Sequence, residues 1–168
     1  MDIIIEHYSV DNIKWFKEHE GMDAFKCDIL YDGKKIGEFS EHYMNGPDIY
    51  SLGIDEIKKL RETATKFFGT YSKDEDLITD RFSSNEDFFI RFLRNLKEAS
   101  ELAENGDGIE ISTSYPFEYT IYENVKEEKN GFYEENNEYK ILFPVRPCKT
   151  NITVSEKEET HELNWKFW

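Results

Sequence analysis

The clearest alternation of hydrophobic and polar residues lies in the segment Ala24–Gly53. Every second position in its first part is apolar, at Phe25, Cys27, Ile29 and Tyr31. This period of two places side chains on one face of a strand. The pair Asp32-Gly33 then suits the positive φ angles of a tight hairpin turn. The segment therefore predicts a β-hairpin, followed by a Gly-Pro break, a third extended piece and the start of a helix.

The return strand of this hairpin has an irregular pattern. Ile36 and Phe39 are three residues apart, which puts them on opposite faces of a regular strand. Two alternatives remain open: Gly37 marks a β-bulge, or the strand is buried on both faces.

The residues before the hairpin predict a strand and a short helix. The β-branched run Ile3–Ile5 suits a buried strand. Apolar residues then recur at every third position, at Val10, Ile13 and Phe16. Either Ser9 or Asp11 can cap a helix with this apolar face. We therefore expect a short helix that ends near Gly21.

Apolar residues at intervals of three and four predict two amphipathic helices in the middle of the chain. The first spans about residues 54–68 and ends at Gly69, a residue typical of helix C-termini. The second spans about residues 85–104 and is followed by two turn-forming pairs, Asn105-Gly106 and Asp107-Gly108. The chain beyond Gly108 is dense in Ile, Thr and Tyr, which favours strands.

These elements predict an α+β fold in a single domain, residues 1–168. A helix-rich part, 54–105, lies between β-rich parts at 1–53 and 108–168, so we expect a mostly antiparallel sheet with an N-terminal hairpin and two helices packed on it. No run approaches the roughly 20 apolar residues of a membrane helix, and the N-terminus lacks a secretion signal. We therefore expect a cytoplasmic protein in which Cys27 and Cys148 are free thiols, with one long-range disulfide as the alternative.

The charge of the chain is its most unusual property. It has 36 acidic and 21 basic residues, a net charge of -15. Such a field repels nucleic acid and anionic membranes and speeds association with a basic partner. The alternative is that the charge serves solubility alone.

The acids form three clusters along the sequence. The first contains Asp74, Glu75, Asp76, Asp80, Glu86 and Asp87, with Arg81 as its one cation. The second contains Glu98, Glu101, Glu104, Asp107 and Glu110, with no basic residue among them. The third contains Glu118, Glu123, Glu127, Glu128, Glu134, Glu135 and Glu138, diluted by Lys126, Lys129 and Lys140. A row of unneutralised carboxylates costs stability through repulsion, so it indicates either solubilisation or an anionic binding surface.

The leading hypothesis is a non-enzymatic acidic interaction protein that binds and inhibits a basic, nucleic-acid-handling protein. In composition the chain is similar to phage-encoded inhibitors of nucleases and to immunity proteins of nuclease toxins. No residue correspondence accompanies that similarity. The first two acidic clusters are the expected contacts, because rows of carboxylates can occupy the phosphate-binding groove of such a partner.

Two alternatives belong to other functional classes. The phosphate-binding and dinucleotide-binding glycine motifs, the serine-hydrolase elbow and the C-x-x-C pair are all missing, so we expect neither an enzyme nor a cofactor. His42 nevertheless has Glu41 and Asp48 nearby, which favours a small metal-binding protein or metal-dependent enzyme as the second hypothesis. The third is a structural subunit that assembles through a sheet edge or its Trp-rich tail.

Overall fold

The computed structural model describes residues 3–42, 47–74, 85–104, 106–123, 131–135 and 138–144. Its first elements are strand β1 (Tyr8–Lys17), the short 3-10 helix η1 (His19–Gly21), and strands β2 (Asp23–Tyr31), β3 (Lys34–Ser40) and β4 (Ile49–Ser51). Helices α1 (Ile54–Tyr71) and α3 (Asn85–Leu102) follow. The last elements are strands β5 (Gly108–Ser112), β6 (Tyr119–Tyr122), β7 (Gly131–Glu135) and β8 (Glu138–Pro144). The predicted α+β class is confirmed.

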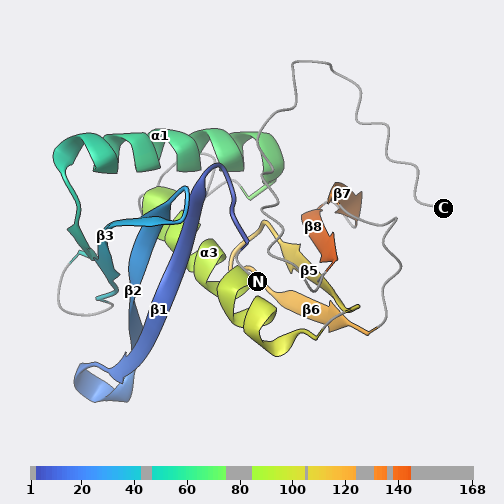
Figure 1. The fold of residues 1–168 in the computed structure, drawn as a ribbon, viewed down its shortest axis with the longest axis horizontal. Helices are drawn as coiled ribbons and strands as arrows, with labels where there is room; N and C mark the ends of the chain where they lie inside the picture. Colours follow the sequence, from blue (N-terminus) through green and yellow to red (C-terminus); the bar gives the residue numbers. More distant parts are fainter. Residues whose placement is uncertain are drawn as a thin grey trace.

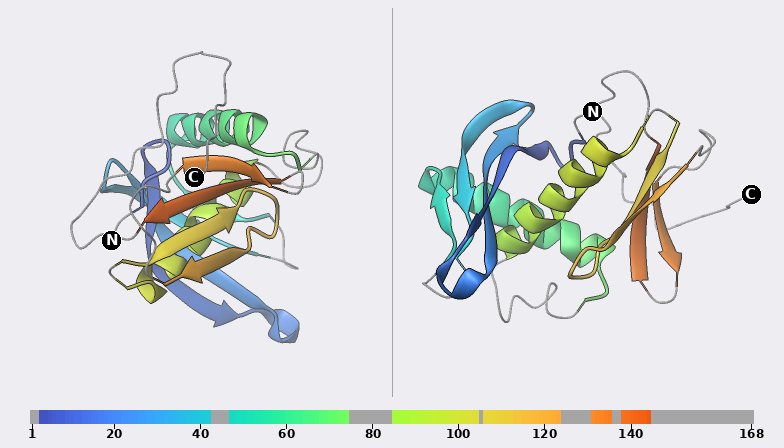
Figure 2. Two further views of the ribbon diagram at one scale, coloured as in Figure 1. Left: turned by 90° about the vertical axis from the view of Figure 1, so that its right-hand side faces the viewer. Right: turned by 90° about the horizontal axis from the view of Figure 1, so that it is seen from below.

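The strands form two antiparallel sheets with α3 between them (Figures 1 and 2). The first sheet has the order β1-β2-β3-β4 and the second the order β6-β5-β8-β7. Helix α3 contacts β1 on one side and β5 and β6 on the other, and α1 packs against α3. Each sheet therefore has an inner face, against the helices, and an outer face turned away from them.

The core is rich in aromatic rings where the helices meet the second sheet. Phe67 and Phe68 of α1 contact Phe92 of α3, and Phe117 stacks on Phe68 with ring centroids 5.8 Å apart. All four are buried. Burying one such side chain contributes roughly 1.5–3 kcal/mol. This cluster joins the helices to the second sheet.

The segment predicted to form a short helix near the N-terminus is strand β1, so that prediction is wrong. The pairing of β1 with β2 shifts register between Asp11 and Lys14. Asn12, within this bulge, has a φ of 51°. The extra residue changes which positions face the core, and as a result Val10 and Ile13 lie on the same side although they are three residues apart. The bulge therefore explains the spacing of Val10 and Ile13, whereas Phe16 pairs with Ala24 on the outer face.

The run Ile3–Ile5 is buried as expected, although its one strand-like contact is an isolated bridge between Ile5 and Tyr8. These two residues exchange backbone hydrogen bonds of 2.9 and 2.8 Å. Glu6 and His7 between them both have positive φ angles, the geometry of a two-residue turn. The run enters the core just before β1 begins.

The predicted hairpin is confirmed. β2 pairs with β3 in antiparallel register, and Asp32 and Gly33 have φ angles of 48° and 74°. The register shifts after Ile29↔Gly37, which confirms the bulge alternative for the return strand. A Cβ atom on Gly37 would overlap the carbonyl oxygen of Ser51, so glycine here permits the close approach of β4.

Both predicted helices are present, but α1 does not end at Gly69. It continues to Tyr71 and stops where Ser72 becomes extended. A Cβ atom on Gly69 would have no neighbour within 4 Å, so the glycine occupies an exposed helical position. Glycine inside a helix costs only about 1 kcal/mol, which packing of the apolar face outweighs. No helix among the described residues is both long and apolar enough to cross a membrane.

Candidate functional site

The first acidic cluster is only partly within the described chain. Glu75, Asp76 and Asp80 lie outside the described residues. Asp74 is partly buried and accepts a hydrogen bond of 3.2 Å from the backbone N–H of Tyr115. This carboxylate therefore helps to hold the loop before β6.

Glu86 and Asp87 are part of the fold's internal contacts. Glu86 has 2% of its side chain exposed and forms an ion pair of 2.6 Å with Arg61 of α1. Asp87 accepts a hydrogen bond from the hydroxyl of Tyr50 on β4. Burial, together with the charge of Asp87, raises the pKa of Tyr50 well above its usual range. These two acids join α3 to α1 and to the first sheet, which leaves Glu86 little surface for a partner.

Two acids of the second acidic cluster pair with cations one turn earlier on α3. Arg94 Nε lies 3.9 Å from Glu98 Oε2, and Lys97 Nζ lies 3.7 Å from Glu101 Oε1. Glu98 also accepts a hydrogen bond of 2.8 Å from the indole N–H of Trp15. The row is therefore mixed in charge, because residues four apart are neighbours on a helix.

The end of this cluster leads into the second sheet. Asp107 accepts a hydrogen bond of 2.8 Å from the backbone N–H of Glu104, which closes the turn after α3. Glu110 lies on β5 between Ile109 and Ile111, two fully buried residues of the inner face. Alternation along the strand places Glu110 on the outer face of the second sheet.

The outer face of the second sheet carries a small network of charges. We call Glu110, Tyr122, Glu135, Glu138 and Lys140 the acidic face. Lys140 Nζ lies 3.3 Å from Glu110 Oε1 and 3.0 Å from Glu135 Oε2. The hydroxyl of Tyr122 donates to Glu110 at 3.5 Å, and 45% of Tyr122 is exposed. Lys140 thus pairs with two carboxylates, while Glu138 accepts a hydrogen bond from the hydroxyl of Ser112. This side of the molecule faces the viewer in the left panel of Figure 2.

The negative field of the acidic face affects its titrating groups. The charge of Glu110 raises the pKa of the Tyr122 hydroxyl. The hydrogen bond to Glu135 is the main cause of a raised pKa at Lys140. Both directions follow from carboxylates that stabilise a positive group and oppose a second negative one.

The excess of acids extends around the second sheet. Within the described residues from 106 to 144 the acids are Asp107, Glu110, Glu118, Glu123, Glu134, Glu135 and Glu138, and the one cation is Lys140. Lys73, just after α1, reaches in to pair with Glu134. Residues 3–42, which contain β1 to β3 and their loops, have nine acids and five lysines. The excess of acids over cations among the described residues is therefore largest around the second sheet.

The residues of the metal hypothesis are adjacent, but their carboxylates bind an arginine. Arg91 of α3 donates to Glu41 Oε1 through Nε and to Asp48 Oδ2 through Nη2, both at 2.7 Å. Although burial opposes it, the charges of Asp48 and Glu41 raise the pKa of Arg91. Among the described residues, no three His, Cys, Asp or Glu side chains are placed to hold a metal ion. Glu41 and His42 are neighbours in extended chain, so their side chains point to opposite faces.

The imidazole of His42 has two partners that sequence reasoning missed. His42 Nδ1 lies 3.0 Å from Glu18 Oε1, and His42 Nε2 lies 3.4 Å from Ser40 Oγ. The i, i+2 spacing of Ser40 and His42 was visible in the sequence. Glu18 is 24 residues away along the chain and is brought in by the antiparallel pairing of β1, β2 and β3.

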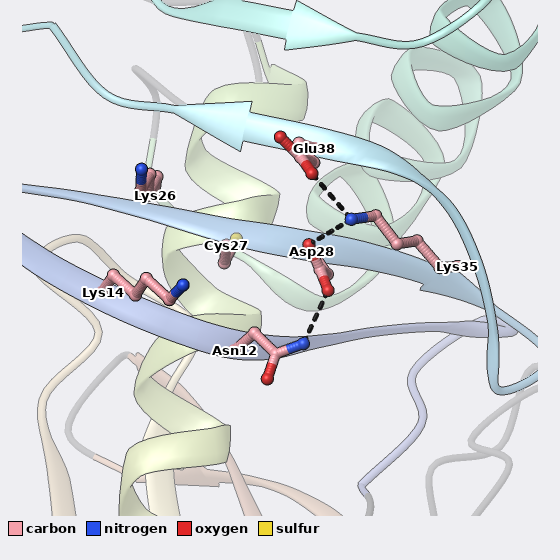
Figure 3. Close-up of a pocket in the computed structure, with 7 residues that line it drawn as sticks. All are labelled: Asn12, Lys14, Lys26, Cys27, Asp28, Lys35 and Glu38. Atoms are coloured by element: carbon pink, nitrogen blue, oxygen red, sulfur yellow. Dashed lines mark hydrogen bonds and ion pairs between the residues drawn. The ribbon is translucent and has the colours of Figure 1, made fainter.

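A hollow of about 350 Å³ lies on the outer face of the first sheet (Figure 3). Asp28 in this hollow accepts hydrogen bonds from Lys35 and Asn12, which lower its pKa. Lys14 and Lys26 are register partners on neighbouring strands. Neither ammonium group has a hydrogen bond or ion pair with another residue that the structure describes. The hollow also contains Lys35, which forms ion pairs with Asp28 and Glu38. Lys14 and Lys26 are thus two adjacent cations, an arrangement that repulsion disfavours.

The chain was compared with protein-family models, with curated proteins and with solved structures, and none of the three comparisons found a match.

Proposed function

We propose that this chain is an acidic binding protein whose acidic face docks on a basic protein. One observation carries the proposal: among the described residues, Lys140 is the single cation on an outer sheet face that presents Glu110, Glu135 and Glu138. The surface proposed here lies on the second sheet rather than on α3. The reason is that Arg94 and Lys97 already neutralise part of the helical row.

The acidic face has the chemistry of a protein-binding surface. Tyr122 offers an exposed ring with a hydroxyl beside the carboxylates, and tyrosine is enriched in protein interfaces. Exposed Glu118 and Glu123 flank β6 and enlarge the anionic area. Their charges would mainly raise the association rate of a basic partner, and salt would weaken that effect.

We propose that the partner handles nucleic acid and that binding inhibits it. Proteins of that kind hold phosphates with closely spaced Lys and Arg residues. A surface with carboxylates on adjacent strands offers charges to the same cations. Nucleic acid and this chain should then compete for one surface of the partner.

The test compares two triple variants that change the net charge equally. Glu118→Gln, Glu123→Gln and Glu135→Gln neutralise acids at the second sheet. Glu20→Gln, Glu56→Gln and Glu62→Gln neutralise exposed acids at the first sheet and α1. Basic proteins are captured from lysate at low salt and eluted with nucleic acid, and their Kd for each variant is measured.

We expect the first triple variant to bind about tenfold more weakly, since each exposed ion pair contributes about 0.2–1 kcal/mol. The control triple variant should bind as the natural chain does. If both triple variants lost affinity equally, net charge alone would explain binding, and the acidic face would not be the docking surface. Capture that nucleic acid does not displace would contradict a nucleic-acid-handling partner.

A further inference from the structure

Ser40, His42 and Glu18 meet on the outer face of the first sheet, on the side of the molecule opposite the acidic face. Ser40 ends β3, and His42 lies two residues beyond it, so alternation places both side chains on one face. Glu18 follows the last residue of β1. The carboxylate, the imidazole and the hydroxyl form a chain with distances of 3.0 and 3.4 Å.

The small side chain of Ala24 explains how residues of β1 and β3 meet across β2. Ala24 pairs with Phe16 of β1, and the backbone N–H of Glu41 donates to the carbonyl of Phe25 at 2.9 Å. This register places His42 beside Ala24. A methyl group there leaves room for His42 and Glu18 to meet above β2, and Ala24 is fully covered.

The surroundings fix the orientation of the imidazole. Glu18 has 4% of its side chain exposed and His42 has 27%, so the carboxylate is buried beneath the ring. A carboxylate is an acceptor, so the Nδ1 atom carries the proton and the Nε2 lone pair of the neutral ring faces Ser40. The backbone N–H of His42 donates to Asp48 Oδ1 at 2.8 Å, and Asp48 is in turn held by Arg91 of α3. His42 is thus held in place at its ring and at its backbone.

We propose that Ser40 is an activated nucleophile, with His42 as its general base and Glu18 as the positioning residue, in a site that cleaves esters carrying an acidic group. A nucleophile within reach of a base that a third group orients is the recurring arrangement of serine hydrolases, and the contact between nucleophile and base is often long without substrate. This proposal goes beyond the binding function and contradicts the sequence-based expectation of a non-enzymatic protein.

The reaction would follow two balanced steps. Ser40 Oγ forms a bond to the ester carbonyl carbon while its proton moves to His42 Nε2, and the alcohol leaves with that proton as its C–O bond breaks. Water then attacks the acyl-serine and gives a proton to His42. The carboxylic acid leaves, and the proton returns to Ser40 Oγ.

The lysines of the hollow supply the preference for an acidic substrate. Lys26 is the register partner of Ser40 on β2, and Lys14 is the register partner of Lys26 on β1. Their side chains therefore lie on the face that carries Ser40 and His42. A carboxylate or phosphate on the substrate would relieve the repulsion between the two ammonium groups.

The first experiment measures labelling of Ser40 by a fluorophosphonate probe. Ser40 Oγ bonds to phosphorus, fluoride leaves, and peptide mass spectrometry locates the adduct. We expect stoichiometric labelling of Ser40 and about a hundredfold slower labelling in His42→Gln. Glu18→Gln should lower the maximal rate and leave the half-saturating probe concentration unchanged. Ser51→Ala, on neighbouring β4, is the matched control and should be labelled at the natural rate.

An unlabelled Ser40, or one labelled equally fast in His42→Gln, would overturn the proposal. Circular dichroism of each variant separates lost chemistry from lost folding, and His7→Gln serves as a control histidine exchange. The second experiment compares hydrolysis of p-nitrophenyl acetate with that of mono-p-nitrophenyl succinate. Lys26→Ala should lower kcat/KM about tenfold more for the anionic succinate than for the neutral acetate. Equal losses for both esters would contradict the role of the lysines. Neither experiment depends on the acidic face, so the two proposals fail separately.

Discussion

Arg91 joins the first sheet to α3 through two buried carboxylates. Its guanidinium is 11% exposed, and it holds Glu41, which is fully buried, and Asp48, which is 7% exposed. The second oxygen of Glu41 has no hydrogen-bond partner among the residues that the structure describes. A buried carboxylate without a cation is far more costly than the pair itself is favourable.

Replacing this arginine should therefore destabilise the protein strongly. For Arg91→Met we expect the free energy of unfolding in urea to fall by about 3–5 kcal/mol, because two buried acids lose their cation. Lys17→Met is the control, since it breaks an exposed ion pair with Asp23 and should cost less than about 1 kcal/mol. Similar small losses in both variants would show that the buried carboxylates are solvated after all.

Residue types alone could not show which acids belong to the fold. Glu86 belongs to the first acidic cluster, which was expected to contact a partner, yet it is buried against Arg61. Glu98 and Glu101 pair with cations four residues earlier, and both cations precede the first acid of the second cluster. His42 was identified as a candidate, but its partner Glu18 depends on strand pairing that local sequence does not specify.

At the scale of elements, the spacing of apolar residues and the turn-forming residues predicted the features that depend on local geometry. The hairpin at Asp32-Gly33 and both long helices follow from such signals. The failure at β1 has a local cause too, because the bulge at Asn12 changes the phase of the alternation. These signals could not predict the number of sheets, because the separation of the strands into two sheets is decided by packing on α3.

Two glycines should respond to alanine in opposite directions. Gly37→Ala introduces a methyl group against the Ser51 backbone, so we expect the β3–β4 pairing to open and the melting temperature to fall by several degrees. Gly69→Ala fills open space on α1 and should add roughly 0.5–1 kcal/mol of stability. Thermal unfolding of both variants checks this. A neutral Gly37→Ala would contradict the close approach of β4.

For the whole molecule, buried tyrosines should make the stability of the folded state fall at alkaline pH. Burial raises the pKa of Tyr8 to about 12, and it raises that of Tyr50 further still. Tyrosine in an unfolded chain ionises near pH 10. Because the folded pKa is the higher one, this contribution to stability is complete below about pH 10 and is lost as the pH rises toward 12.

We expect tyrosinate absorbance and circular dichroism to change together in this range. Tyr50→Phe removes one ionising group and should move the alkaline midpoint to higher pH. Tyr115→Phe, at a half-exposed ring, is the control and should leave it in place. Full titration of the tyrosines while the circular dichroism stays native would contradict the burial of Tyr8 and Tyr50.

The position of α3 between the sheets has a consequence for synthesis on the ribosome. The four strands of the first sheet are complete at Ser51, but the helix that covers their inner face ends at Leu102. For about fifty residues of elongation, Phe25, Ile29 and Phe39 lack the complete α3 to pack against. At the usual speed of translation this lasts for seconds, longer than a hairpin takes to form. The nascent chain should therefore be most prone to aggregate, and most in need of a chaperone, before α3 emerges.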